Sequence, residues 1–139
     1  MKNNPLLFFF GVLVLLSISC GGQQPMIVEL KPCQGPEVTS WLEDTFQRID
    51  KAYNSTELTT EELERIYQSQ QNQVTHVCMT QAQEFAVGIF YHELQATYAI
   101  EQGDSNKSLD QFMQAKDSYD KMVIELKRLS EEYAWGYDW

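Results

Sequence analysis

Basic side chains are scarce in this chain of 139 residues, which has 10 Lys and Arg residues, 20 Asp and Glu residues and a formal net charge of -10. An acidic surface repels phosphate backbones, so we expect no binding to nucleic acid. The same charge disfavours contact between the folded part and anionic lipid headgroups. It is compatible with a basic protein partner, although solubility alone is its simplest explanation.

Motifs for catalysis and for metal binding are also missing. The chain has no Gly-x-Ser-x-Gly elbow and no Gly-rich loop that opens a helix. Its histidines, His76 and His92, would lie about 160° apart on a continuous helix, and neither follows a glutamate at the spacing used in di-metal bundles. Cys33 and Cys78 lack the paired spacing of a zinc site. We therefore expect a non-enzymatic protein without a metal or a cofactor.

The one long apolar run, Leu6–Leu16, is too short to cross a bilayer, which takes about 20 residues. Lys2 precedes this run, and the small residues Ser17 and Ser19 follow it, directly before Cys20. A charged start, an apolar stretch and a small-residue cleavage site are typical of a secretory signal. We predict a signal peptide over residues 1–19.

The end of this signal, Ser17-Ile18-Ser19-Cys20, resembles the lipobox of bacterial lipoproteins. The resemblance implies that Cys20 becomes the first mature residue and carries several acyl chains, which hold a protein stably on a membrane. Residues 20–36 would then be a tether, and Gly21 in place of Asp favours the periplasmic face of the outer membrane. Ser17 stands where a lipobox normally has leucine, so ordinary cleavage and secretion without lipid, or an uncleaved anchor, are the alternatives.

The number of cysteines supports lipidation. An exported chain with three cysteines leaves one thiol unexplained. Lipidation of Cys20 leaves Cys33 and Cys78, which we expect to form a disulfide in an oxidising compartment. Closing a loop of about 45 residues would stabilise the fold by about 3–4 kcal/mol in the chain-entropy model.

Helical spacing dominates the mature chain, and no stretch alternates like a strand. We predict an all-α, up-down bundle of about four helices over residues 37–134. A first helix would end at Asn54-Ser55-Thr56, and Thr59 with Glu62 forms a capping box that starts the next one. No proline interrupts residues 60–102, where we expect a break near residues 78–81, with Thr80 and Gln83 as a further cap.

The last helix is predicted to follow Gly103, a residue that favours helix ends, and to begin at Ser105 or Ser108. Its expected core stripe comprises Leu109, Phe112, Met113, Tyr119, Met122, Val123, Leu126, Leu129 and Tyr133. The segment that includes this turn is similar to one tetratricopeptide hairpin at Tyr98, Gly103-Asp104, Ser108, Phe112 and Ala115. No second copy follows, and such repeats need about three units, so an ordinary antiparallel helix pair is the alternative.

Aromatic residues crowd the C-terminus, where residues 135–139 form a tail. Tyr133, Trp135, Tyr137 and Trp139 are of the types that contribute most at interfaces, so we predict that they bind a partner or a membrane interface. The alternative is that they fold back over Trp41 or Phe46. The sequence as a whole predicts a membrane-anchored binding or assembly factor of the bacterial cell envelope. The alternative function is a secreted helical domain that binds a small apolar or peptide ligand.

Overall fold

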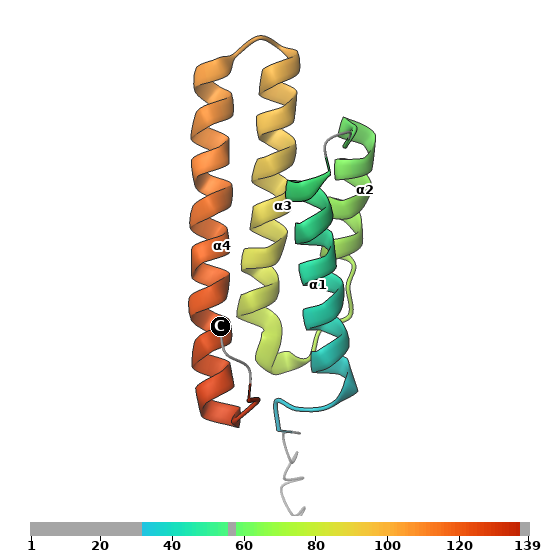
Figure 1. Cartoon of the computed structure of the whole chain (residues 1–139), viewed down its shortest axis with the longest axis vertical. Coiled ribbons are helices and arrows are strands. Elements are labelled where there is room, and N and C mark those ends of the chain that lie inside the picture. Colours follow the sequence, from blue (N-terminus) through green and yellow to red (C-terminus); the bar gives the residue numbers. More distant parts are fainter. Residues whose placement is uncertain (1–31, 56–57, 137–139) are drawn as a thin grey trace, which may run out of the picture. The chain divides into compact units, whose positions relative to one another are not determined.

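Four α-helices run in alternating directions in the computed structural model (Figure 1). The structure describes residues 32–55 and 58–136. The helices are α1 (Pro36–Asn54), α2 (Thr60–Gln71), α3 (Thr80–Glu101) and α4 (Ser105–Tyr133), and a short 3-10 helix, η2 (Val77–Met79), precedes α3. The predicted all-α, up-down bundle is confirmed. The predicted signal peptide, Cys20, Tyr137 and Trp139 lie outside the described residues.

Local sequence accounts for most helix ends. Thr59 Oγ1 accepts a hydrogen bond from the backbone N–H of Glu62 at 3.2 Å, and Glu62 Oε2 accepts one from the N–H of Thr59 at 3.0 Å. This is the predicted capping box. Gly103, after α3, has a φ of 76°, which favours glycine. Asp104 then caps α4 by accepting a hydrogen bond from the N–H of Lys107 at 3.0 Å.

The predicted break between residues 60 and 102 is confirmed, but it is longer than expected and begins earlier. Helix α2 already ends at Gln71, and η2 leads into α3. The expected cap formed by Thr80 and Gln83 is absent, because Thr80 Oγ1 donates to the carbonyl of Val77 at 2.8 Å. Gln83 instead points into the core, where it joins a polar network.

Helix α3 is the central element and packs against both α2 and α4. Its contact with α4 is close because small residues face each other there. Ala96 and Ala99 of α3 are buried, as are Ser108 and Ala115 of α4. A Cβ atom added at Gly88 would lie 3.1 Å from Ser118 Oγ. The helices of this hairpin have 22 and 29 residues, whereas a whole tetratricopeptide repeat has about 34, so the fold fits an ordinary antiparallel pair.

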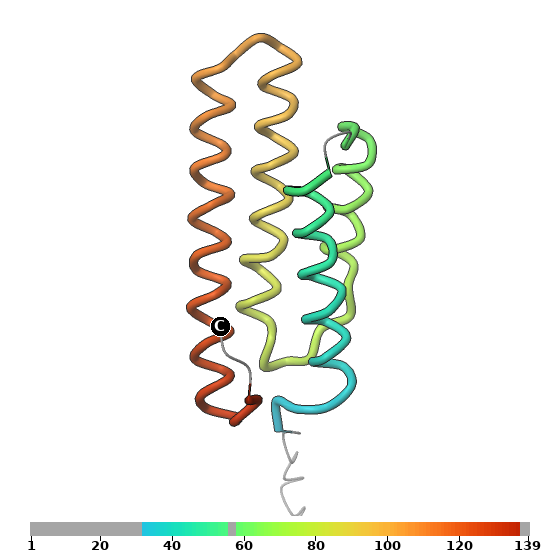
Figure 2. The backbone as a smooth tube through the Cα atoms, viewed as in Figure 1, coloured from blue at the N-terminus to red at the C-terminus, as the bar shows by residue number. Residues whose placement is uncertain are grey.

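The predicted core stripe of α4 is wrong in its first half. Leu109, Phe112 and Met113 are 62%, 39% and 65% exposed, whereas Met122 and Leu126 are fully buried. Asp120 and Ile124 lie three turns after Leu109 and Met113 on the same face of α4, and both are exposed, so this face is the solvent side of the helix. In addition, α4 has 29 residues and α1 has 19. The α3–α4 hairpin therefore extends past the end of α1, as the backbone trace shows (Figure 2), and this part of α4 has no helix opposite it on that side.

A buried polar network joins α1, α2 and α3. The side chains of Thr45 and Gln70 are fully buried. Gln70 Nε2 donates to Thr45 Oγ1 at 3.1 Å and to Gln83 Oε1 at 2.8 Å, and Trp41 Nε1 donates to the same Gln83 oxygen at 2.7 Å. Arg48 Nη1 donates to Gln70 Oε1 at 2.8 Å. One glutamine side chain thus holds partners on two neighbouring helices.

Substituting Gln70 with alanine should destabilise the bundle by about 1–3 kcal/mol, because Thr45 and Arg48 lose a buried partner. Gln71, the next residue, is exposed, and its substitution with alanine should change stability by less than about 0.5 kcal/mol. Urea unfolding followed by circular dichroism measures both. Equal stability of the two variants would contradict a structural role for the network.

Candidate functional site

A cleft of about 470 Å³ opens where the end of α1 lies beside α3 and α4. Its volume is within the range of about 300–1,000 Å³ that is usual for ligand pockets. Most of its walls are apolar or aromatic, with two charged groups among them. The lining residues are Ile49, Tyr53, Glu93, Phe112, Lys116 and Tyr119.

Glu93 is the unusual group in this cleft, because it is a carboxylic acid with only 9% of its surface exposed. Burial raises the pKa of Glu93 above its ordinary value of 4.5, while a hydrogen bond from the Tyr53 hydroxyl acts in the opposite direction. Burial also raises the pKa of Tyr53, and the bond to Glu93 and its charge add to this effect. Lys116, the cation of the cleft, lies 2.5 Å from Asp120, so its charge is directed to that partner.

An exposed apolar stripe adjoins the cleft. Phe112 and Met113 lie three and four residues after Leu109, so the three side chains share one face of α4. Phe112 belongs to both the stripe and the cleft wall. Contiguous exposed apolar surface marks interaction sites in soluble domains. The cleft and the stripe (Leu109, Phe112, Met113) together form the strongest candidate for a binding surface.

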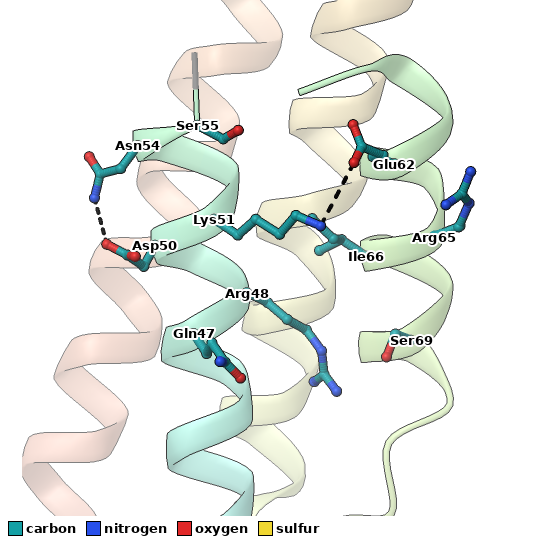
Figure 3. A pocket seen from close by; sticks show the side chains of 10 residues that line it. All are labelled: Gln47, Arg48, Asp50, Lys51, Asn54, Ser55, Glu62, Arg65, Ile66 and Ser69. Carbon is teal, nitrogen blue, oxygen red and sulfur yellow. Dashed lines mark hydrogen bonds and ion pairs between the residues drawn. The ribbon is translucent and has the colours of Figure 1, made fainter. Parts of the chain in front are cut away.

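A second and larger hollow, of about 610 Å³, lies between α1 and α2. Figure 3 shows that polar and charged side chains line it. Lys51 Nζ lies 3.9 Å from Glu62 Oε1 across the groove, and Arg48 Nη1 donates to Gln73 Oε1 at 2.6 Å. These cations already have partners within the chain, and the groove offers only Ile66 as an apolar wall. It fits a solvated surface better than a ligand site.

The disulfide and part of the aromatic tail lie together at the other end of the bundle. Cys33 and Cys78 are bonded, as predicted, with 5.8 Å between their Cα atoms. Trp135 packs against the core and its Nε1 donates to the carbonyl of Cys33 at 2.6 Å. Gln34 Nε2 donates to the carbonyl of Tyr133 at 2.7 Å. The structure therefore places Tyr133 and Trp135 against the bundle, away from the cleft.

Sequence reasoning missed two functional candidates. Glu93 falls on the same face of α3 as Ala86 and Phe90, and a carboxylate on an apolar face was the available signal. In the sequence, His76 forms no metal-binding pattern with His92, yet its Nδ1 lies 3.0 Å from Cys78 Sγ. No local sequence pattern predicts this contact. A third potential ligand, Cys33, bonds to Cys78 although it lies 45 residues away in the sequence.

Comparison with known proteins gave no match to a family model, to a curated protein or to a solved structure. None of the helices within residues 32–55 and 58–136 is both long and apolar enough to cross a membrane.

The raised pKa of Glu93 predicts a pH-dependent stability. The folded state holds the Glu93 proton more tightly than the unfolded chain, so this group makes stability fall as pH rises from 4.5 through the raised pKa. Glu93→Gln should match the wild type near pH 4 and become the more stable of the two at neutral pH. Thermal unfolding across this range measures the difference. Glu43→Gln, at an exposed site of α1, is the control, and a pH-independent difference for Glu93→Gln would contradict the shift.

Proposed function

We propose that this chain is a non-enzymatic lipoprotein of the bacterial cell envelope, anchored through Cys20, that binds a protein partner through the cleft and the stripe. The observation that carries the proposal is the exposed apolar face of α4 beside a concave cleft. Large apolar side chains at helical spacing are exposed there at a cost in solubility that partner binding explains.

The position of the tether end supports this assignment. Cys33 lies beside the C-terminal end of α4, since Trp135 and Gln34 bond across this junction. The α3–α4 turn lies at the opposite end of the bundle (Figure 1). The described chain thus begins at the end of the bundle opposite the α3–α4 turn, and the stripe starts four residues into α4, next to this turn.

The chemistry of the cleft favours a partner segment with apolar side chains and one basic side chain. An amphipathic helix presents apolar residues at the same three-and-four spacing as the stripe. A Lys or Arg side chain entering between Tyr53 and Phe112 would meet the buried Glu93 carboxylate. The excess of acidic side chains in the chain attracts such a segment over longer distances.

Crosslinking from inside the cleft tests the partner. Phe112 is replaced by the photoreactive benzoylphenylalanine in the native host, and Ile124, which is 67% exposed about three turns further along α4 and does not line the cleft, is replaced in a matched control. We expect a discrete protein adduct from position 112 that position 124 does not give, and its loss when Tyr53→Asp is added. Equal adducts from both positions, or no adduct from position 112, would contradict the proposed binding surface.

A small apolar ligand is the second candidate, since the cleft has the volume of a ligand pocket. Native mass spectrometry of the protein purified from its host distinguishes the two. A bound molecule of small mass that Phe112→Asp removes would favour the ligand over the protein partner.

The anchor has its own test. The intact mass of the protein taken from host membranes should correspond to a chain that starts at Cys20 and carries added acyl chains. Cys20→Ala should remove the acyl mass and block maturation at this site. A mature protein that starts elsewhere without lipid would show that it is secreted free.

A further inference from the structure

Cys33, His76 and Cys78 bring three potential metal ligands together at the tether end of the bundle. Their ligand atoms all lie within 4.8 Å of one another. Within residues 32–55 and 58–136, no other group of histidine, cysteine or carboxylate side chains was found to gather in this way. Around one zinc ion two thiolate sulfurs and an imidazole nitrogen lie about 3.5–4 Å apart, given bond lengths of about 2.3 and 2.0 Å. The three ligand atoms are therefore already close to the separations that one zinc ion requires.

The imidazole of His76 is oriented for this role. Its Nδ1 accepts a hydrogen bond from the backbone N–H of Cys78 at 3.3 Å and lies 3.0 Å from Cys78 Sγ. An accepting Nδ1 carries one lone pair and no proton, which is the form in which histidine binds a metal, so a cation bound at Nδ1 would replace the hydrogen bond from the Cys78 N–H. The cap that His76 provides for η2 holds the ring in this place.

The segment that carries Cys33 is held independently of its sulfur. The Cys33 carbonyl accepts from Trp135 Nε1, and the adjacent Gln34 side chain donates to Tyr133. Cys33 is 1% exposed and belongs to the core, and α1 begins three residues later. These contacts would keep the two sulfurs near each other after the disulfide opens, so that a site would form without a large rearrangement.

We propose that the reduced form of this protein binds one soft d10 cation of the Zn²⁺ class through Cys33 Sγ, Cys78 Sγ and His76. A dithiol supplies two electrons and two protons, which break the S–S bond and leave a thiol on each cysteine, and the dithiol becomes a disulfide. The cation then displaces both thiol protons, because thiolates are the metal ligands. The oxidised form has no thiolate to offer, so the disulfide excludes the cation.

Three protein ligands would leave a fourth, open position. An open position of this kind, filled by water, is usual for zinc sites outside purely structural ones. The assignment does not depend on the partner surface, which lies at the opposite end of α3.

Zinc titration of the same chain in its two redox forms tests the proposal. The mature full-length protein is reduced anaerobically with a water-soluble phosphine, which is then removed by gel filtration, and Zn²⁺ is added in competition with a chromophoric chelator. We expect one Zn²⁺ per reduced chain and none per oxidised chain. Co²⁺ in place of Zn²⁺ should give thiolate-to-metal absorption. A reduced chain that binds Zn²⁺ no better than the oxidised one would overturn the proposal.

Histidine variants separate the site from free thiols. His76→Ala should weaken Zn²⁺ binding by the reduced chain at least about tenfold, whereas His92→Ala should leave it unchanged, since His92 Nδ1 bonds to Gln111 at 2.9 Å on another part of the fold. Far-UV circular dichroism of each reduced variant confirms that the helices are intact. Equal affinities for the two variants would show that only the thiols bind and would overturn the assignment of His76.

Discussion

The buried contact between Gln70 and its partners sets where α1 lies on the rest of the bundle. Trp41, Thr45 and Arg48 occupy one face of α1 at helical spacing, and each bonds into the network around Gln70 or Gln83. A shift of α1 by one turn would break all of these bonds inside the protein, where an unpaired polar group is costly. Apolar contacts alone would tolerate such a shift more easily. The network therefore fixes the position of α1 along the neighbouring helices, in addition to stabilising the fold.

The candidate surface follows from this register. Ile49 and Tyr53 lie on the same side of α1, one and two turns beyond Thr45, and they form the α1 wall of the cleft. Because α1 ends at Asn54, the face of α4 beyond it stays exposed. Phe112 is the residue of the stripe that lines the cleft together with Ile49 and Tyr53. Leu109 and Met113 lie on the solvent side of α4.

Local features of the fold, such as the helix ends, could be predicted from the sequence, but the packing partners of each helix could not. The capping box at Thr59 and the glycine after α3 depend on neighbouring residues, and both are confirmed. Leu109, Phe112 and Met113 have the same spacing as buried residues, so periodicity alone cannot tell an apolar face in the core from one in solvent. Gln70 lies among polar residues in the sequence, and only tertiary packing shows that it is buried. The burial of Glu93 and the contact of His76 with Cys78 likewise depend on how the chain packs.

The two candidate sites are separated by a single straight element. Cys78 lies in η2, two residues before α3 begins at Thr80, and Glu93 lies 13 residues after Thr80, which corresponds to about 20 Å of helix. Helix α3 is buried over most of this length between α2 and α4, so it forms a rigid spacer. A partner helix lying along the stripe would therefore leave His76 and Cys78 uncovered. The proposed metal site and the proposed binding surface thus lie in different parts of the bundle, so that neither would block the other sterically.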